Sequence, residues 1–184
     1  GSDGKEQTIR RPREAVRYGL GLVPEDRISQ GVILTASVRR NMTLPILRRL
    51  RRGAIVEAKR EGEITHQYIN ALRIKTPNDA TMIRNLSGGN QQKVSIAKWL
   101  AARCDVIFFD EPTHGIDVGA KHDIYQLLRQ LADEGTGVVM ISSELPEVIN
   151  VCDRIMVFRD GEIVKEIDNE PKVSEQDVVA YALG

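Results

Sequence analysis

A serine, two glycines and a polar run stand immediately before a predicted helix, in the segment Leu86-Ser87-Gly88-Gly89-Asn90-Gln91-Gln92-Lys93. The glycines leave backbone N–H groups accessible, Ser87 adds a hydroxyl, and the start of a helix carries partial positive charge. Together these groups predict a site for phosphate oxygens. The same pattern also occurs at plain helix starts, so it needs a second feature to support it.

That second feature is the acidic pair Asp110-Glu111, which follows the apolar run 106–109. Such a run is typical of a strand buried on both faces of a parallel sheet. Ligands of these sheets bind beyond the carboxyl ends of the strands, where carboxylates can hold Mg²⁺ and polarise a water molecule. Taken alone, the pair is equally typical of a solvated strand end, but with the glycine segment it predicts phosphoryl-transfer chemistry.

The elements that must position these residues alternate between strands and helices. Apolar runs predict a short strand at 20–23 and buried strands at 106–109 and 138–141. Amphipathic spacing predicts helices at 12–18, 90–103 and 116–135, and a helical insertion from 37 to about 80. Asp160-Gly161 predicts a hairpin between 154–158 and 162–167, and Ser174 with Asp177 predicts a cap for a last helix at 175–183. The expected fold is α/β with a parallel core sheet.

Composition limits the class of protein. The 184 residues include 26 Lys and Arg against 26 Asp and Glu, and 41% of them are hydrophobic. The longest apolar run, 178–183, has six residues, far below the roughly 20 that span a bilayer. The two cysteines, Cys104 and Cys152, make neither a disulfide framework nor a metal-ligand spacing. These observations predict a soluble domain of a reducing, cytoplasmic compartment.

Charge is distributed unevenly along the chain. Residues 1–100 carry 19 Lys and Arg against 9 Asp and Glu, and the remaining residues carry 7 against 17. The basic excess is greatest at Arg39, Arg40, Arg48, Arg49, Arg51 and Arg52. Such a cluster predicts a nucleic-acid or membrane-surface patch, or a solvated helix face that docks a partner. No aromatic residue that could stack on bases lies between Tyr18 and Tyr68, which favours the solvated face.

Several segments resemble one family of enzymes, the ATP-binding cassette (ABC) ATPases. Residues 86–92 look like the family's signature sequence, 108–113 are similar to its Walker B segment, and 115–117 to its D-loop. Asn90, together with the runs 115–121 and 142–147, further resembles the second cassette of the tandem ATPase subunits of ribose- and galactose-type sugar importers. The resemblance covers essentially the whole chain and implies a P-loop NTPase-like ABC cassette with a C-terminal hairpin plus helix.

The resemblance implies a role for each matching residue. Asp110 would ligate Mg²⁺ through water, and Glu111 would orient or deprotonate the attacking water. The nucleotide-binding residues that it implies are Ser87, Gly88, Gly89, Asn90, Gln91, Glu25 and Asp117. Of these, Ser87, Gly89 and Gln91 would contact the γ-phosphate of an ATP bound mainly by an opposing cassette. Asp117 would cross that dimer interface.

The chain departs from the family pattern in three places. No Gly-x-x-x-x-Gly-Lys-Ser/Thr occurs, so the chain is expected to begin after the Walker A strand and loop and to hydrolyse essentially no ATP by itself. Glu25 stands where the family usually has the Q-loop glutamine, and this carboxylate could still reach Mg²⁺. Ser143 occupies the position where the family has its switch histidine, and it is a candidate catalytic residue. It can hydrogen-bond a phosphate but cannot carry the charge of an imidazole.

The resemblance also implies the organisation of the chain. Residues 1–184 would form a partial ABC domain with a Q-loop region at 3–36, a helical subdomain at 37–83, and the signature, Walker B, D-loop, switch and C-terminal parts at 84–184. In the intact protein, ATP binding and hydrolysis would drive sugar uptake from the inner face of the bacterial plasma membrane. The implied partners are a second cassette, a membrane permease docked on the helical subdomain, and indirectly a periplasmic sugar-binding protein.

Other interpretations stay open. Glu25 and Ser143 favour a non-catalytic regulatory or structural half-cassette, which would be a binding module. The basic half of the chain raises a soluble ABC ATPase of DNA repair or translation, although the importer-like segments argue against nucleic acid as a partner. A parallel sheet that lacks its phosphate-loop strand would expose an apolar edge, which predicts self-association. Of the three histidines, only His114 lies near the predicted site.

Overall fold

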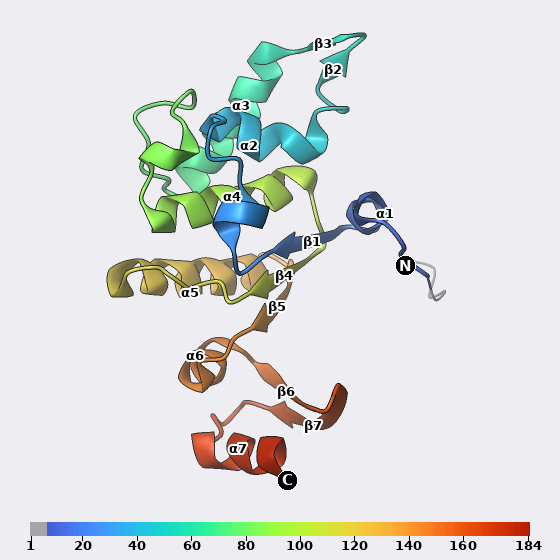
Figure 1. Cartoon of the computed structure of the whole chain (residues 1–184), viewed down its shortest axis with the longest axis vertical. Helices are drawn as coiled ribbons and strands as arrows, with labels where there is room; N and C mark the ends of the chain where they lie inside the picture. The colour runs from blue at the N-terminus through green and yellow to red at the C-terminus, as the bar shows by residue number, and fades with distance from the viewer. Residues whose placement is uncertain (1–6) are drawn as a thin grey trace. The chain divides into compact units, whose positions relative to one another are not determined.

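A computed structural model describes residues 7–184 (Figure 1). The described residues form two compact units, of which the first ends at Val139 and the second spans Met140–Gly184. Three strands form a parallel sheet with the order β1-β4-β5. They are β1 (Leu20–Val23), β4 (Val106–Asp110) and β5 (Gly137–Ile141). The predicted α/β class and the three strands are confirmed, with β5 beginning one residue earlier than expected.

The register of β1 and β4 places two predicted site segments at one edge of the sheet. Leu20 pairs with Val106 and Val23 with Phe109, in parallel. Because paired parallel strands end at the same edge, the chain after β1 and the chain after β4 leave the sheet next to each other. The first of these segments carries Glu25 and the second carries Glu111. Before β1, the predicted short helix is present as α1 (Pro12–Arg17) and is followed by Gly19 at φ 73°.

The expectation that β4 is buried on both faces and that β5 is also buried is wrong. Ile107 and Phe109 are fully buried, but Phe108 between them is only half-buried. On β1, Val23 is buried whereas Leu22 is 50% exposed, and the side chains of β5 are half-buried or exposed. The physical reason is that β1 and β5 are the edges of a narrow sheet and that helix packing concentrates on one face.

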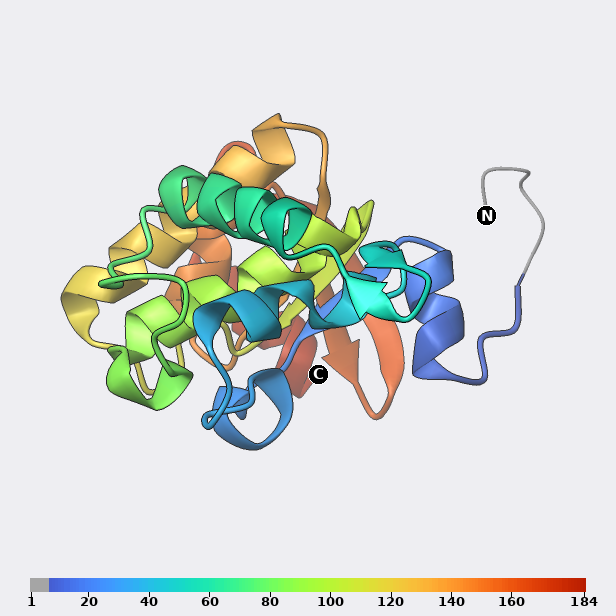
Figure 2. The same ribbon diagram turned by 90° about the horizontal axis from the view of Figure 1, so that it is seen from above.

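That covered face lies against α4 (Gly88–Ala102), the predicted helix of the glycine segment, which begins two residues earlier than expected. A Cβ added at Gly21 would meet the Trp99 side chain at 3.0 Å, so the missing side chain lets the helix approach β1. On its other sides α4 packs against α2 (Val38–Thr43), α3 (Ala58–Ala71) and α5 (Val118–Asp133) (Figure 2). α5 buries the four residues that its spacing predicts, Ile124, Leu127, Leu128 and Leu131.

The insertion from 37 to 80 is not helical throughout. α2 is followed by a 3₁₀ turn (Leu44–Ile46) and then by a short antiparallel ribbon of β2 (Arg51–Arg52) and β3 (Ile55–Val56). The ribbon turns at Gly53, which has φ 63°. Glycine adopts this left-handed conformation without a steric penalty, and the β-branched pair after it favours a strand. A further 3₁₀ turn (Ile83–Asn85) leads into α4.

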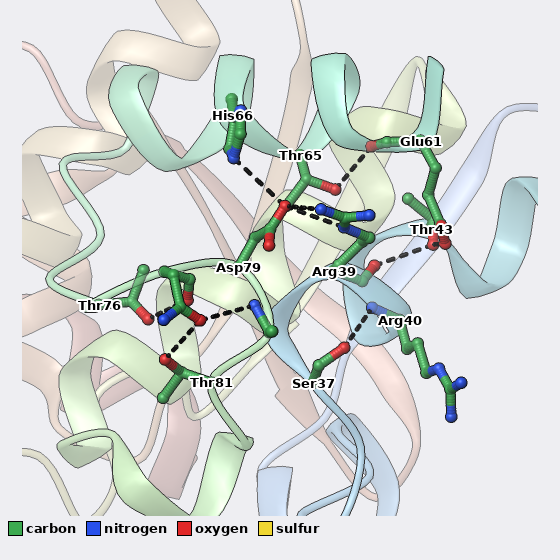
Figure 3. Close-up of polar contacts among 12 residues, drawn as sticks. Ser37, Arg39, Arg40, Thr43, Glu61, Thr65, His66, Thr76, Asp79 and Thr81 are labelled. Carbon is green, nitrogen blue, oxygen red and sulfur yellow. Dashed lines mark hydrogen bonds and ion pairs between the residues drawn. The ribbon is translucent and has the colours of Figure 1, made fainter. Parts of the chain in front are cut away.

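Buried polar contacts hold the helical part together (Figure 3). Asp79 is only 6% exposed, and its Oδ2 accepts a hydrogen bond from Arg39 Nε on α2 at 2.9 Å. His66 on α3 places its Nε2 at 3.2 Å from the same oxygen. One carboxylate therefore joins α2, α3 and the loop that leads toward the glycine segment.

The second unit is built around the predicted hairpin. It comprises α6 (Leu145–Val151), β6 (Arg154–Arg159), β7 (Glu162–Asp168) and α7 (Glu175–Leu183). The hairpin turns at Asp160 and Gly161, with φ 53° and 83°. Ser174 caps α7 by accepting the N–H of Asp177 at 3.2 Å, as the sequence predicts. Across residues 7–184, none of the helices has the length and apolar character that crossing a membrane requires.

Candidate functional site

Asn90 connects the hydroxyl of Ser87 to a neighbouring loop. Its Nδ2 donates to Ser87 Oγ at 2.8 Å, and its Oδ1 accepts the backbone N–H of Lys75 at 2.7 Å. A hydroxyl that already accepts a hydrogen bond still has its own hydrogen to donate. Ser87 stands just before the first turn of α4 in an extended conformation. The arrangement therefore presents an O–H donor beside the free N–H groups of a helix start.

A pocket with a volume of about 370 Å³ lies at the first turns of α4 and α5. Its walls combine predicted site residues with three cationic and two acidic side chains. The lining residues are Arg73, Lys75, Ser87, Gly89, Asn90, Lys93, Asp117, Gly119, Ala120 and Asp123. Lys93 Nζ lies 3.0 Å from Asp123 Oδ2, and this contact lowers the pKa of the Asp123 carboxyl. The cationic excess of the walls suits an anionic ligand.

The two glycines of the segment make room for neighbouring groups. A Cβ at Gly89 would lie 2.9 Å from the Cβ of Ala120, so this glycine allows α4 and α5 to approach closely. A Cβ at Gly88 would lie 2.8 Å from Nη2 of Arg27. Asp117 caps α5 by accepting the N–H of Ala120 at 3.0 Å. The predicted signature and D-loop segments are thus brought into direct contact.

The side chain of Gln91 lies away from this pocket. It is buried, and its Nε2 donates to the carbonyls of Ile83 at 3.2 Å and Leu86 at 3.1 Å. These bonds fix the loop that precedes α4. The predicted contact of Gln91 with a phosphate stays a prediction, and among the described residues its observed partners belong to the protein backbone.

The second group of predicted residues lies at the carboxyl edge of the sheet. Asp110 ends β4 and Glu111 follows it with φ 45°, a left-handed conformation that is unfavourable for a residue with a side chain. Glu25 follows the neighbouring strand β1. The exposed imidazole of His114 places its Nδ1 at 3.6 Å from Glu25 Oε1. The edge therefore gathers carboxylates from two adjacent strands, with one histidine beside Glu25.

These carboxylates fit the implied Mg²⁺ site. Within residues 7–184 no group of three or more His, Cys, Asp or Glu forms a metal cage. Mg²⁺ is usually held by one or two carboxylates plus water and phosphate oxygens. Asp110 and Glu25, at the ends of adjacent strands, provide that kind of donor set.

Cys104 is buried, and burial raises the pKa of its thiol to about 11, so a neutral thiol is expected there.

Two residues that the sequence did not single out hold the segment after Glu25. Arg27 donates to the carbonyls of His114 at 2.9 Å and Gly115 at 3.2 Å. Lys98, buried on α4, donates from Nζ to the carbonyl of Gly31 at 2.6 Å. Sequence spacing contains no signal for either contact, because each joins residues more than sixty positions apart.

Ser143 belongs to the second unit, between β5 and α6. The neighbouring Ser142 donates to Glu147 Oε2 at 3.2 Å and accepts the N–H of Glu144 at 3.1 Å. These bonds order the turn in which Ser143 lies. The role of Ser143 as a catalytic residue stays a prediction.

Comparisons with known proteins agree on one family. Residues 2–114 match the family model described as ABC transporter. The chain is 47% identical over 183 residues to the ribose import ATP-binding protein RbsA of Hahella chejuensis, covering 99% of this chain and 36% of that protein. It is 48% identical to the arabinose import ATP-binding protein AraG 1 of Burkholderia thailandensis, covering 98% and 36%. The chain thus spans about a third of the length of these curated relatives.

Solved structures give the same fold. The ADP conformation of MJ1267, an ATP-binding cassette of an ABC transporter, superimposes with a TM-score of 0.75 over 98% of this chain and 74% of that chain, at 23% identity. The dimeric post-hydrolysis state of the ATP-binding cassette MJ0796, bound to ADP and phosphate, gives a TM-score of 0.64 at 28% identity, over 81% of this chain and 62% of that one.

Proposed function

Because this chain belongs to the ABC transporter family, we propose that it is part of the ATP-binding subunit of a bacterial carbohydrate importer. Its similarity to ribose and arabinose import proteins supports a pentose or related sugar as the cargo. In the intact protein, ATP binding and hydrolysis would drive uptake of that sugar. This chain would supply the signature, Walker B and D-loop segments.

The observation that carries the proposal is the pocket at the starts of α4 and α5. An oxygen of a terminal phosphate would accept the hydrogen of Ser87 and the free N–H groups of the helix start, while Arg73 and Lys75 add positive charge. Gly88 and Gly89 keep that start free of side chains. The related cassette MJ0796 forms a dimer. In such a dimer, Asp117 would lie at the interface with an opposing cassette.

The carboxylates at the sheet edge account for the chemistry of hydrolysis. Glu111 would accept a proton from the attacking water or orient that water, because it stands where ligands of α/β sheets bind. Asp110 and Glu25 would hold Mg²⁺, which neutralises phosphate charge when it is bound. Ser143 would hydrogen-bond the phosphate from the switch position. Phosphoryl transfer to water depends mainly on such positioning and charge neutralisation.

We expect the 184 residues alone to hydrolyse essentially no ATP. They contain no Gly-x-x-x-x-Gly-Lys-Ser/Thr segment, and that segment supplies the backbone N–H groups and the lysine that hold the β- and γ-phosphates in this class of enzyme. A calorimetric titration of this chain with MgATP up to millimolar nucleotide tests the expectation. Micromolar binding would reveal a phosphate site that the motifs do not predict.

The proposed partners follow from the same assignment. The second nucleotide-binding cassette would face the pocket, and the membrane permease would dock on residues 37–83, at the inner face of the plasma membrane. A periplasmic sugar-binding protein would act through the permease. Self-association through the edges of the sheet stays a prediction, which sedimentation over a range of protein concentrations tests.

A non-catalytic half-cassette is the second candidate, and Glu25 and Ser143 are the residues that favour it. A carboxylate and a hydroxyl replace an amide and an imidazole at the two positions that the family uses near the γ-phosphate. This candidate differs from the first in one measurable property. The site of Glu111 would then not be the one that turns over ATP.

The test uses the protein expressed with all the sequence that its gene encodes, reconstituted with its permease. Glu111→Gln is expected to abolish phosphate release or lower it at least about a hundredfold, the range for removing a catalytic acid–base group. Glu162→Gln, an exposed carboxylate of β7, is the matched control and should leave the rate unchanged. Unchanged turnover in Glu111→Gln would instead support the non-catalytic candidate.

A further inference from the structure

The guanidinium of Arg27 bridges segments that lie far apart in the sequence. Nη1 donates to the His114 carbonyl at 2.9 Å and Nη2 to the Gly115 carbonyl at 3.2 Å. Both carbonyls belong to the turn that joins Glu111 to Asp117. A planar guanidinium suits two adjacent acceptors, because its N–H groups point in fixed directions.

The same guanidinium also lies against the start of α4. A Cβ at Gly88 would lie 2.8 Å from Nη2, and a Cβ at Gly115 would lie 3.6 Å from Nη1. Glycine at both positions lets the guanidinium enter between the two backbones. Any larger residue at 88 would displace a side chain that two hydrogen bonds hold in place. Arg27 thus touches the segment of Ser87 as well as that of Asp117.

The other end of Arg27 is firmly anchored. It begins a single π-helical turn (Arg27–Gly31) that Asp26 caps by accepting the N–H groups of Ile28 and Ser29, each at 3.1 Å. Hydrogen bonds from Ser29 lower the pKa of the Asp26 carboxyl. At the end of this turn the Gly31 carbonyl accepts from Lys98 of α4 at 2.6 Å. The backbone of Arg27 is therefore held in place within the segment that begins at Glu25.

One atom of Arg27 does not fit a role in stability alone. Its Nε is buried and has no hydrogen-bond partner in the part of the chain that the structure describes. A buried donor without a partner lowers stability. The guanidinium is placed so that its two outer nitrogens reach the turn, and the inner nitrogen is left without an acceptor.

We infer that Arg27 is a positioning residue that fixes the turn 111–117 and the start of α4 relative to the segment of Glu25. A displacement of the Glu25 segment would be transmitted through Arg27 to the residues that carry Glu111, Asp117 and Ser87. In this role Arg27 would act through these segments and would not itself contact the nucleotide. Its link to turnover rests on the proposed function, whereas its link between the three segments rests on the contacts alone.

Amide hydrogen exchange on the full chain tests the link between segments. The reporters are three hydrogen-bonded amides: His114 to the Glu111 carbonyl at 3.0 Å, Ile116 to Thr113 at 3.2 Å, and Gln91 to Ser87 at 2.9 Å. In Arg27→Gln these amides should exchange at least about tenfold faster, as local opening allows, while amides of α7 keep their rates. Arg17→Gln, an exposed arginine of α1, is the control. Unchanged rates at all three reporters would overturn the inference.

Arg27→Lys is the second variant, in case Arg27→Gln does not fold. Lysine keeps the charge but has no planar pair of donors. Faster exchange at His114 and Ile116 than in the wild type would support the bidentate role of the guanidinium. Wild-type rates in Arg27→Lys would show that charge alone is sufficient and would overturn it.

Turnover by the complete importer separates positioning from contact with the nucleotide. Arg27→Gln should lower kcat by about 10- to 100-fold, the effect of a small misplacement of reacting groups, while KM for ATP changes by less than about twofold. A higher KM with unchanged kcat would show direct binding of ATP and overturn the inference. If the wild type has no turnover, the proposed function fails, and the exchange measurement still decides the role of Arg27.

Discussion

Asn90 donates a hydrogen bond from its Nδ2 to Ser87 Oγ over 2.8 Å, one turn apart at the start of α4. Through its Oδ1 the same side chain holds the backbone of Lys75 at 2.7 Å. One amide therefore sets the orientation of the predicted phosphate-contacting hydroxyl and the position of the loop that brings two cations to the pocket. The consequences of this relationship can be measured.

Asn90→Ala removes both bonds and should lower the free energy of unfolding by about 2 kcal/mol, at about 1 kcal/mol for each hydrogen bond. Urea denaturation followed by circular dichroism measures the change. The matched control is Asn85→Ala, an exposed asparagine of the preceding 3₁₀ turn, which should change stability by less than about 0.5 kcal/mol. Equal effects in the two variants would contradict the structural role of Asn90.

Gly89→Ala should lower stability by about 1–3 kcal/mol, because its Cβ would lie 2.9 Å from that of Ala120 and force α4 and α5 apart. Gly119→Ala is a matched substitution at the start of α5, where the nearest atom, Asp117 Oδ1, lies 3.5 Å from the new Cβ. Alanine there should be neutral or stabilise by up to about 1 kcal/mol, because it restricts the unfolded chain. Thermal unfolding of the two variants should therefore shift in opposite directions or, at the least, by clearly different amounts.

Lys98 should make stability depend on pH above neutrality. Burial lowers the pKa of its ammonium to about 8 from an ordinary 10.5. Below pH 8 the lysine is charged in both states, so the folded chain carries the full penalty of a buried charge. Between pH 8 and 10.5 the unfolded chain still holds a proton that the folded chain has lost, so the contribution of Lys98 to stability rises with pH, by about 3 kcal/mol in total.

Lys98→Met should abolish this rise. The unfolding free energy of Lys98→Met minus that of the wild type, measured in urea from pH 7 to 10.5, should fall as pH increases. Lys59→Met, on the exposed start of α3, is the control, and its difference from the wild type should stay constant over the same range. A constant difference for Lys98→Met as well would show that the ammonium is not desolvated.

Asp79→Ala should destabilise the helical part by about 2 kcal/mol. Removing one partner of a buried ion pair leaves the other unpaired, and the loss is moderate because water can solvate Arg39, which is 32% exposed. His66→Gln removes only an exposed partner of the same carboxylate (Figure 3) and should change stability by less than about 1 kcal/mol. Urea denaturation ranks the two variants, and a larger effect of His66→Gln would contradict the assignment of Asp79 as the central group.

Local chemistry explains which elements could be predicted from the sequence. The hairpin at Asp160-Gly161, the cap at Ser174 and the stripe of α5 follow from residue types at short spacing, and the structure confirms them. The ribbon of β2 and β3 was missed because its two-residue strands are too short to show a period of two. Its visible signal was Gly53, followed by a β-branched pair.

Long-range contacts explain what could not be predicted. Burial of β1, β4 and β5 depends on which faces the helices cover, and no run of apolar residues specifies that. The pocket could be anticipated only in part: Ser87, Asn90 and Asp117 carry recognisable motifs, whereas Arg73 and Lys75 reach it through the end of α3. Arg27 contacts residues 87 and 88 positions away, and its sequence neighbourhood gives no indication of them.

Glu111 has a left-handed backbone conformation, with φ 45°. Stability and catalysis therefore favour different residues at this position. Glycine or asparagine would relax that conformation and remove a backbone penalty on the order of 1 kcal/mol. A library selected only for survival on heating should therefore become enriched in glycine at 111. The same library selected for growth on an imported sugar should keep glutamate there. Position 111 is thus a site where engineering for robustness would remove the proposed activity without any loss of fold.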